Sequence, residues 1–108
     1  METYKVLAQE APAATTLTDA YTVPASTSAV ISSIVAAETN GAADDIRISI
    51  AVAGAADSPE QYIAFDFALS ANDSQAFTLG ITLATTDVVR VYSTTGDTVF
   101  NVFGVEIT

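Results

Sequence analysis

The chain has no cysteine and no histidine among its 108 residues. Without cysteine, neither a disulfide nor a thiolate metal site can form. Without either residue type, the Ser–His–Asp and Cys–His arrangements of nucleophilic catalysis are excluded. A serine paired with Lys5, the single lysine, stays open as a nucleophile–base pair, but no other feature of the sequence points to it. We therefore predict a protein that is not an enzyme.

Basic residues are also scarce, because Lys5, Arg47 and Arg90 stand against 13 acidic residues and give a net charge of -10. Three cations cannot neutralise a phosphate backbone, so we expect no direct binding to nucleic acid. An anionic membrane surface is disfavoured for the same reason. The charge also makes copies of the chain repel one another, so the contacts of any assembly must either overcome this repulsion or keep the acids away from them.

Long hydrophobic runs are missing, and no segment approaches the roughly 18 apolar residues of a membrane helix. The first residues, METYKVLAQEAPAATT, show no basic stretch followed by an apolar stretch, so no signal peptide is visible. We expect the protein to be made and kept in the cytoplasm, or assembled there into a particle that later leaves.

Helical periodicity is almost absent, and strict alternation of apolar and polar residues takes its place. The stretch DDIRISIAVAGAADSPEQYIAFDFAL, from Asp44 to Leu69, contains two such segments around the loop GAADSP. We predict that Ile46–Val52 and Ile63–Leu69 are strands that turn one face to the core. The predicted core-facing residues are Ile46, Ile48, Ile50, Val52, Ile63, Phe65, Phe67 and Leu69.

The same reading gives about eight short strands separated by turn residues at intervals of 8–12 residues, a pattern typical of sandwiches and small barrels. We predict an all-β, two-sheet antiparallel sandwich of jelly-roll or Ig-like type in a single domain, residues 1–108. Residues 1–16 are predicted to be an N-terminal arm that contacts a partner. The predicted strands are Tyr4–Ala8, Thr16–Val23, Ala29–Ala37, Ile46–Ala53, Gln61–Leu69, Ala76–Leu83 (with a bulge at Gly80), Asp87–Tyr92 and Val99–Ile107.

The last predicted strand is apolar on both faces, as in strands that are central or lie at a subunit contact. Val99, Phe103, Val105 and Ile107 share one face of this predicted strand, and Phe100 and Val102 share the other. The aromatic residues could also form a sugar-stacking platform, but their strand parity favours core packing. The predicted interface residues are Tyr4, Leu7, Tyr62, Tyr92, Phe100 and Val102.

Carboxylates are the remaining side chains that could take part in catalysis or bind a metal ion. Acid–base catalysis needs two of them converging in a cleft, and the candidates are Asp44-Asp45, Asp57 with Glu60, and Asp66. Most acids here fall at predicted turns, which favours solvated acids that cap local backbone donors. Calcium could bind such loops, with Asp44, Asp45 and Asp57 as candidates. The D-x-D-x-D-G spacing is missing, so we predict no metal and no other cofactor.

Three segments of the chain form a recognisable pattern: KVLAQEAPAATTLTDAYTVPASTSAVISSI, IAVAGAADSPEQYIAFDFALSANDS and GITLATTDVVRVYSTTGDTVFNVFGVEIT. The most distinctive run is TDAYTVPAST, Thr18–Thr27, and FNVFGVEI near the end adds to it. On these segments the whole chain resembles small structural proteins of tailed-bacteriophage virions.

The resemblance implies a virion component assembled in the host cytoplasm, most simply a capsid decoration (cement) protein on the outer surface of the head. It further implies a homotrimer whose partners are its own copies and a major capsid protein. A neck, tail or fibre component is an alternative, and so is a carbohydrate-binding adhesion module with exposed aromatic residues.

Overall fold

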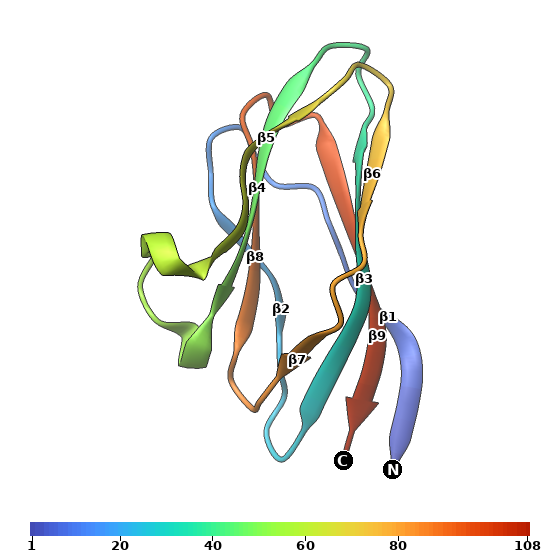
Figure 1. The fold of residues 1–108 in the computed structure, drawn as a ribbon, viewed down its shortest axis with the longest axis vertical. Coiled ribbons are helices and arrows are strands. Elements are labelled where there is room, and N and C mark those ends of the chain that lie inside the picture. The colour runs from blue at the N-terminus through green and yellow to red at the C-terminus, as the bar shows by residue number, and fades with distance from the viewer.

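The computed structural model describes residues 1–108 and contains nine strands in two antiparallel sheets that pack face to face (Figure 1). This arrangement confirms the predicted sandwich. The first sheet has the order β1-β9-β3-β6, with β7 also paired to β3, and the second has the order β2-β8-β4-β5. The strands are β1 (Glu2–Glu10), β2 (Thr18–Thr22), β3 (Ser28–Glu38), β4 (Asp44–Ala51), β5 (Tyr62–Leu69), β6 (Ser74–Phe77), β7 (Ile81–Leu83), β8 (Val88–Ser93) and β9 (Thr98–Ile107).

Nine strands are present instead of eight because the predicted strand Ala76–Leu83 is interrupted. Its two halves, β6 and β7, pair with successive parts of β3, Ile34–Ala37 and Ala29–Ile31. Between them Gly80 takes a positive φ of 62°, a backbone conformation that glycine adopts without strain. The glycine therefore breaks the ladder where only a bulge was expected.

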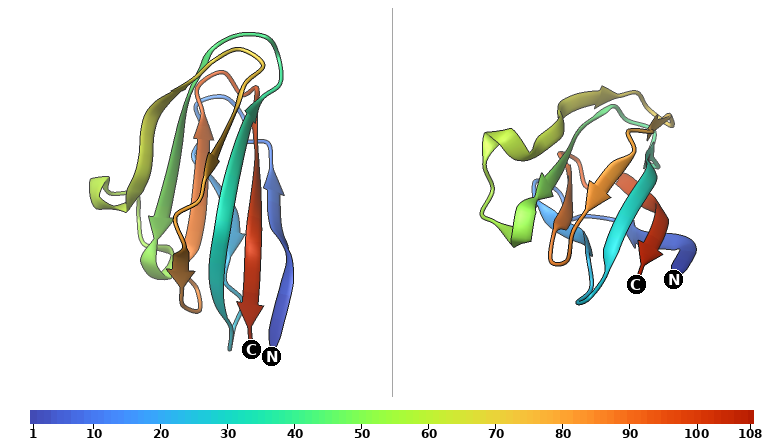
Figure 2. Two further views of the ribbon diagram at one scale, coloured as in Figure 1. Left: turned by 45° about the vertical axis from the view of Figure 1, so that its right-hand side comes forward. Right: turned by 60° about the horizontal axis from the view of Figure 1, so that its bottom comes forward.

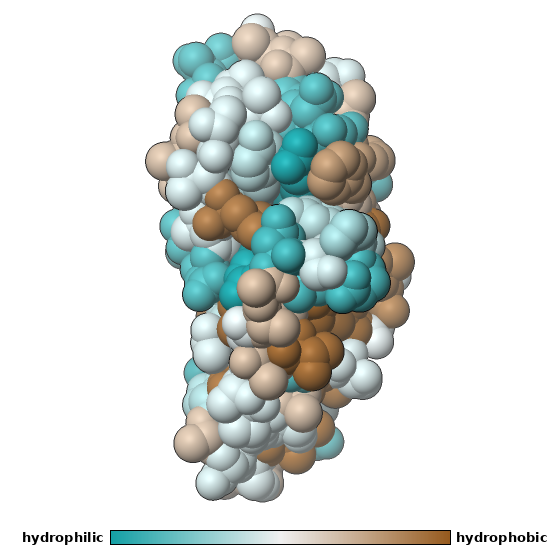
Figure 3. Space-filling view, turned by 90° about the vertical axis from the view of Figure 1, so that its left-hand side faces the viewer, coloured by the Kyte–Doolittle hydropathy of each residue, from teal (hydrophilic) through white to brown (hydrophobic).

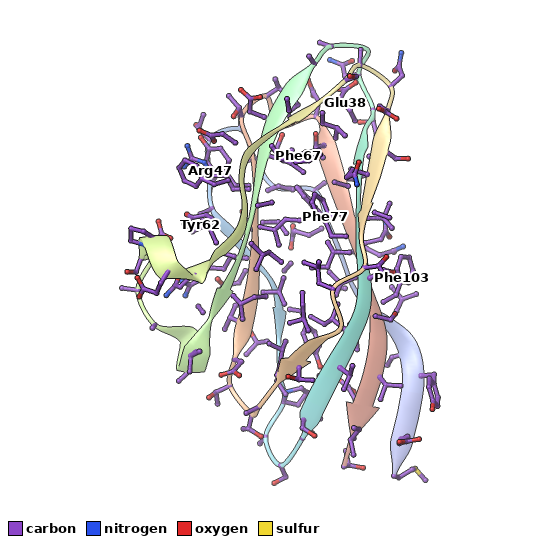
Figure 4. The ribbon with its side chains drawn as sticks, in the orientation of Figure 1. Glu38, Arg47, Tyr62, Phe67, Phe77 and Phe103 are labelled. Atoms are coloured by element: carbon purple, nitrogen blue, oxygen red, sulfur yellow. The ribbon has the colours of Figure 1, made fainter.

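The core lies between the sheets and is built from the alternating inward residues of β3, β4, β8 and β9. Phe100 is its largest fully buried side chain, and Ile46, Ile48 and Val102 are also at 0% exposure. Phe67 of β5 and Phe77 of β6 meet across the two sheets as an edge-to-face pair, with ring centroids 5.4 Å apart. Figure 4 shows these two rings pointing toward each other inside the sandwich. Such pairs stabilise beyond the area they bury.

The N-terminal residues do not form a detached arm. Glu2–Glu10 pairs with β9 along most of its length and forms an edge of the first sheet. The first and last residues of the chain lie side by side (Figure 2), and the backbone N–H of Thr108 donates to the carbonyl oxygen of Met1. The outer edge of β1 is unpaired, so contact of residues 1–16 with a partner stays a prediction.

Helical structure is limited to two short 3-10 turns, η1 (Val52–Gly54) and η2 (Pro59–Gln61), in the connection between β4 and β5. The structure has no helix with the length and apolar character needed to cross a membrane. Val52 belongs to η1 and is 69% exposed, so its predicted place in the core is wrong. The connection projects from the side of the second sheet (Figure 2).

Candidate functional site

The most unusual strand is β5, which carries two irregularities in its pairing with β4. Ile46 pairs with Phe67, Ile48 with Ala64 and Ser49 with Tyr62. In both intervals β5 therefore uses one residue more than β4, and each extra residue reverses the alternation of side chains. In the first interval Asp66 has a left-handed φ of 51°, a conformation that Asp tolerates better than most residues.

The bulge at Asp66 changes which side chains of β5 reach the core. Ala64 faces inward at 8% exposure, whereas Phe65 is 58% exposed and Ile63 is 38% exposed. The predicted core positions of Ile63 and Phe65 are therefore wrong, while Leu69, at 2% exposure, is where it was predicted. An aromatic ring that strict alternation would bury is displayed on the outer face of the second sheet.

Arg47 of β4 lies beside this displayed ring and is held on several sides. Its Cζ atom is 4.2 Å from the centroid of Phe65 and 4.4 Å from that of Tyr92, so two aromatic rings contact the guanidinium. Its Nε donates a hydrogen bond to Oδ1 of Asp66 at 2.7 Å. The hydrogen bond from Arg47 to Asp66 raises the pKa of the arginine above its ordinary value. The guanidinium is thus charged and fixed in place.

The η1–η2 connection forms the other wall of the site and is fastened to the sheet by two side chains. Arg90 of β8 donates to the carbonyl oxygens of Ala55 at 2.7 Å and Gly54 at 3.2 Å. The Asp87 carboxylate accepts from the backbone N–H of Ala53 at 2.9 Å. Because these bonds join the segment to β8 and the turn before it, the wall is positioned before any ligand arrives.

Strands β4 and β5 and the η1–η2 connection together form an open groove of about 620 Å³ on the outer face of the second sheet. Tyr62 and Phe65 meet there edge to face, with centroids 5.0 Å apart and planes at 88°. Burial, with the nearby Asp57 carboxylate as the second cause, raises the pKa of Tyr62 above its ordinary value. The groove is lined by Arg47, Asp57, Ser58, Pro59, Tyr62 and Phe65.

The figures show the setting of this groove. In Figure 4, Arg47 and Tyr62 lie on the side of the second sheet that faces away from the core. The corresponding side of the molecule, viewed directly in Figure 3, carries separate apolar patches between hydrophilic side chains. The groove therefore offers apolar surface and hydrogen-bonding groups within one site, as ligand pockets do.

A second exposed surface lies on the first sheet, over the parts of β1, β9 and β3 that lie toward the two chain termini, at the bottom of Figure 1. Val105 pairs with Tyr4 on one side and with Val30 on the other, so these three share the outer face. Tyr4 is 77% exposed, and the apolar side chains border an open groove of about 480 Å³. Figure 4 places Phe103 on the same outer side of this sheet. We call Tyr4, Val30, Phe103, Val105 and Ile107 the β9 outer face.

The structure places the predicted interface residues in different environments. Tyr4 lies on the β9 outer face, Tyr62 lines the groove on the second sheet, and Tyr92 contacts Arg47 beside that groove. Leu7 is partly buried against the core. Phe100 and Val102 are fully buried core residues, so naming them as contact residues is wrong. Both faces of β9 are apolar. In the structure Phe103, Val105 and Ile107 point outward, and Phe100 and Val102 point into the core.

The three candidate calcium ligands are not brought together, and no three acidic side chains are close enough to hold a metal ion. Asp45 is exposed and Asp57 lies at the groove. Asp44 is buried at 3% exposure, where it accepts hydrogen bonds from the hydroxyls of Ser93 and Thr98 and from the N–H of Thr95. Burial alone would raise the pKa of Asp44, but these hydrogen bonds outweigh it and hold the pKa below its ordinary value.

Glu38 has a similar structural use at the same end of the sandwich, although no sequence feature marked it. Its carboxylate accepts from the backbone N–H groups of Asn72, Asn40 and Gly41, each at 2.9 Å. These bonds, led by that from Asn72, lower the pKa of Glu38. The residue thus joins the β3–β4 turn to the β5–β6 turn.

Sequence reasoning missed Arg47 and Pro59 as site residues, and it favoured core packing over sugar stacking for Phe65. No local signal marked the bulge, because Asp66 falls on the polar face of a regular alternation. The extra residue is visible only in the pairing of β5 with β4. Comparison with known proteins adds nothing to this site, since no protein-family model matches the chain and no curated protein matches it.

Proposed function

We propose that the chain is a non-enzymatic structural protein of a tailed-phage virion, and that it decorates the outer surface of the head. The proposal rests on the full-length resemblance together with one structural observation, the β9 outer face. A decoration protein needs a stiff domain and a surface that makes the same contact many times. The sandwich supplies a stiff domain with ladders fixed on both sides of β9.

The β9 outer face supports a contact with other protein chains. Phe103, Val105 and Ile107 are only partly covered within the domain, and contiguous exposed apolar surface of this kind marks interaction sites. Aromatic residues such as Tyr4 are enriched at the centres of such interfaces. We assign this face to contact with a second copy, because closed symmetric assemblies are the rule for soluble oligomers. The number of three copies comes from the resemblance to virion proteins.

The charge of the chain supports the outer surface of the head over its interior. A net charge of -10 repels packaged DNA. The β9 outer face itself carries few charges, since its groove is bordered by Glu2 and Lys5 alone among charged residues. Copies can therefore meet through this face while most of their acids stay in solvent.

Two measurements test the proposal. Light scattering of the isolated chain is expected to give the mass of a trimer. Mixing the chain with shells of its phage is expected to give a fixed number of copies per capsomer. Recovery of the chain only in detached tails would reject decoration and support the neck or tail alternative.

A pair of variants ties both measurements to the β9 outer face. Val105→Asp puts a charge at the centre of the face and is expected to abolish the trimer and shell binding. Ala71→Asp adds the same charge at an exposed turn and is expected to change neither. Equal behaviour of the two variants would show that the contact lies elsewhere on the chain.

A further inference from the structure

We propose that the groove on the second sheet is a binding site for a neutral saccharide. It lies on the opposite sheet from the β9 outer face, so both surfaces can be occupied at once. The inference goes beyond the proposed head decoration and does not depend on it. It rests on three features of the groove: an exposed aromatic surface, adjacent hydrogen-bonding groups, and the local charge.

The aromatic surface is displayed by a specific backbone device. Phe65 is 58% exposed because the chain adopts a left-handed conformation at Asp66. Bulges of this kind often re-aim a side chain at a functional site. The edge-to-face contact with Tyr62 fixes the orientation of the ring. Arg47 covers one face of the ring, and the part of the ring that stays exposed presents the surface on which the apolar C–H face of a pyranose stacks.

Hydrogen-bonding groups stand next to that ring. Arg47 donates through its Nε to Asp66, and its two terminal amino groups carry four further N–H donors at the groove. Asp57 also lines the groove, where its carboxylate oxygens are acceptors close to the Tyr62 hydroxyl. Neighbouring sugar hydroxyls both donate and accept, so a fixed donor group beside a carboxylate suits them.

The site is rigid before binding. Arg47 is held by two rings and Asp66, while Arg90 and Asp87 hold the opposite wall. A pre-organised site avoids part of the entropy that is lost when side chains become ordered on binding. Exposed aromatic surface beside fixed polar groups therefore favours the binding of a small, uncharged ligand.

The charge of the groove selects among saccharides. Arg47 is balanced by Asp66, which leaves Asp57 as an uncompensated negative charge beside the groove, and the whole chain is strongly acidic. Sialylated, uronic-acid or sulfated sugars are repelled by this field. The ligand class that fits is a glycan ending in a neutral hexose.

The test begins with an array of neutral and anionic glycans probed with the intact chain. The expected result is binding to glycans with a neutral terminal hexose and none to their anionic counterparts. The best glycan is then titrated into the ¹⁵N-labelled chain. Amide shifts are expected at Arg47, Asp57, Tyr62 and Phe65, and not on β1 or β9.

Three variants locate the binding. Phe65→Ala removes the stacking ring, and Arg47→Lys keeps the charge but loses the planar fork; each is expected to weaken binding at least about tenfold, a loss near 1.4 kcal/mol. Tyr4→Ala, which removes an exposed tyrosine from the other sheet, is the matched control and is expected to bind as the unmodified chain does. Circular dichroism verifies that all three are folded.

Several outcomes overturn the inference. They are silence of the array at millimolar glycan, a preference for anionic glycans, unchanged binding by Phe65→Ala, and amide shifts confined to the β9 outer face. Capture of a peptide or of a second copy through the groove also rejects a saccharide site. Shell binding by Phe65→Ala is measured in parallel. Its retention with loss of glycan binding separates this inference from the proposed head decoration.

Discussion

Asp66 accepts a hydrogen bond from Nε of Arg47 at 2.7 Å, while its own backbone is left-handed with a φ of 51°. One residue thus creates the bulge that turns Phe65 outward and also orients the guanidinium that stacks on Phe65. The backbone conformation and the side-chain contact are separable by mutation, because different residue types satisfy each of them.

Replacing Asp66 by valine tests the backbone role. A β-branched residue in the left-handed region costs about 1–2 kcal/mol, so Asp66→Val is expected to lower the free energy of unfolding by this amount relative to Asp66→Asn. Asparagine tolerates the conformation and loses only the ion pair, which is partly exposed and contributes about 0–1 kcal/mol. Urea unfolding followed by circular dichroism measures both. Identical midpoints would contradict the assigned strain.

Gly104 is expected to be among the least replaceable residues of the chain. A Cβ atom at this position would lie 2.1 Å from the carbonyl oxygen of Val30 and 3.0 Å from Cα of Ile31. Gly104→Ala must push β9 away from β3, and we expect a loss of about 3 kcal/mol, at the upper end of overpacking costs.

Gly80→Ala is the control for this variant. No atom lies within 4 Å of its added Cβ, but its φ of 62° remains unfavourable for alanine, so a loss of about 1 kcal/mol is expected. Thermal unfolding of the two variants measures the contrast. A smaller loss at Gly104 than at Gly80 would show that the two strands separate easily.

Asp44 is expected to make stability depend on acid pH. Its pKa in the folded state is lowered below the ordinary value of 3.8, so its contribution is present above that value and is lost as the pH falls through the folded pKa. Asp44→Asn is expected to cost about 1.5–3 kcal/mol at pH 7, as for hydrogen bonds to a charged group. The difference from the unmodified chain should shrink below about pH 4.

The neighbouring variant Asp45→Asn removes an exposed carboxylate and serves as the control. It is expected to change stability by less than about 0.5 kcal/mol at pH 7. Urea unfolding between pH 3 and pH 7 supplies the comparison. A difference between Asp44→Asn and the unmodified chain that stays constant over this range would argue against an ionised, hydrogen-bonded Asp44.

Two buried serines are expected to respond in opposite ways to replacement by alanine. Ser49 and Ser93 are both at 0% exposure, but the hydroxyl of Ser49 has no hydrogen-bond partner, whereas that of Ser93 donates to Asp44 and accepts from the N–H of Gly96. Ser49→Ala is expected to be neutral or to stabilise by up to about 1 kcal/mol, and Ser93→Ala to destabilise by about 1–3 kcal/mol. Equal losses in thermal unfolding would refute this contrast.

The strands could be predicted because their side chains alternate with a period of two. Where one face is clearly polar, as in β4, the alternation also identified the core residues Ile46 and Ile48. The alternation did not identify the core residues of β9, because both faces of this strand are apolar. Only the contacts of β9 with β1 and β3 decide which face lies inside. The groove was missed for a related reason, because Arg47 and Phe65 are 18 positions apart and meet only through the register of β4 with β5.

The sequence alone determined the class of this protein. Period-two alternation, an acidic composition and the absence of cysteine and histidine specify an all-β sandwich without thiol or imidazole chemistry. The tertiary structure decided which side chains are displayed. An added residue in one strand reverses every side chain beyond it, and the pairing at Asp66, which exists only between β4 and β5, is what places Phe65 in solvent beside Arg47.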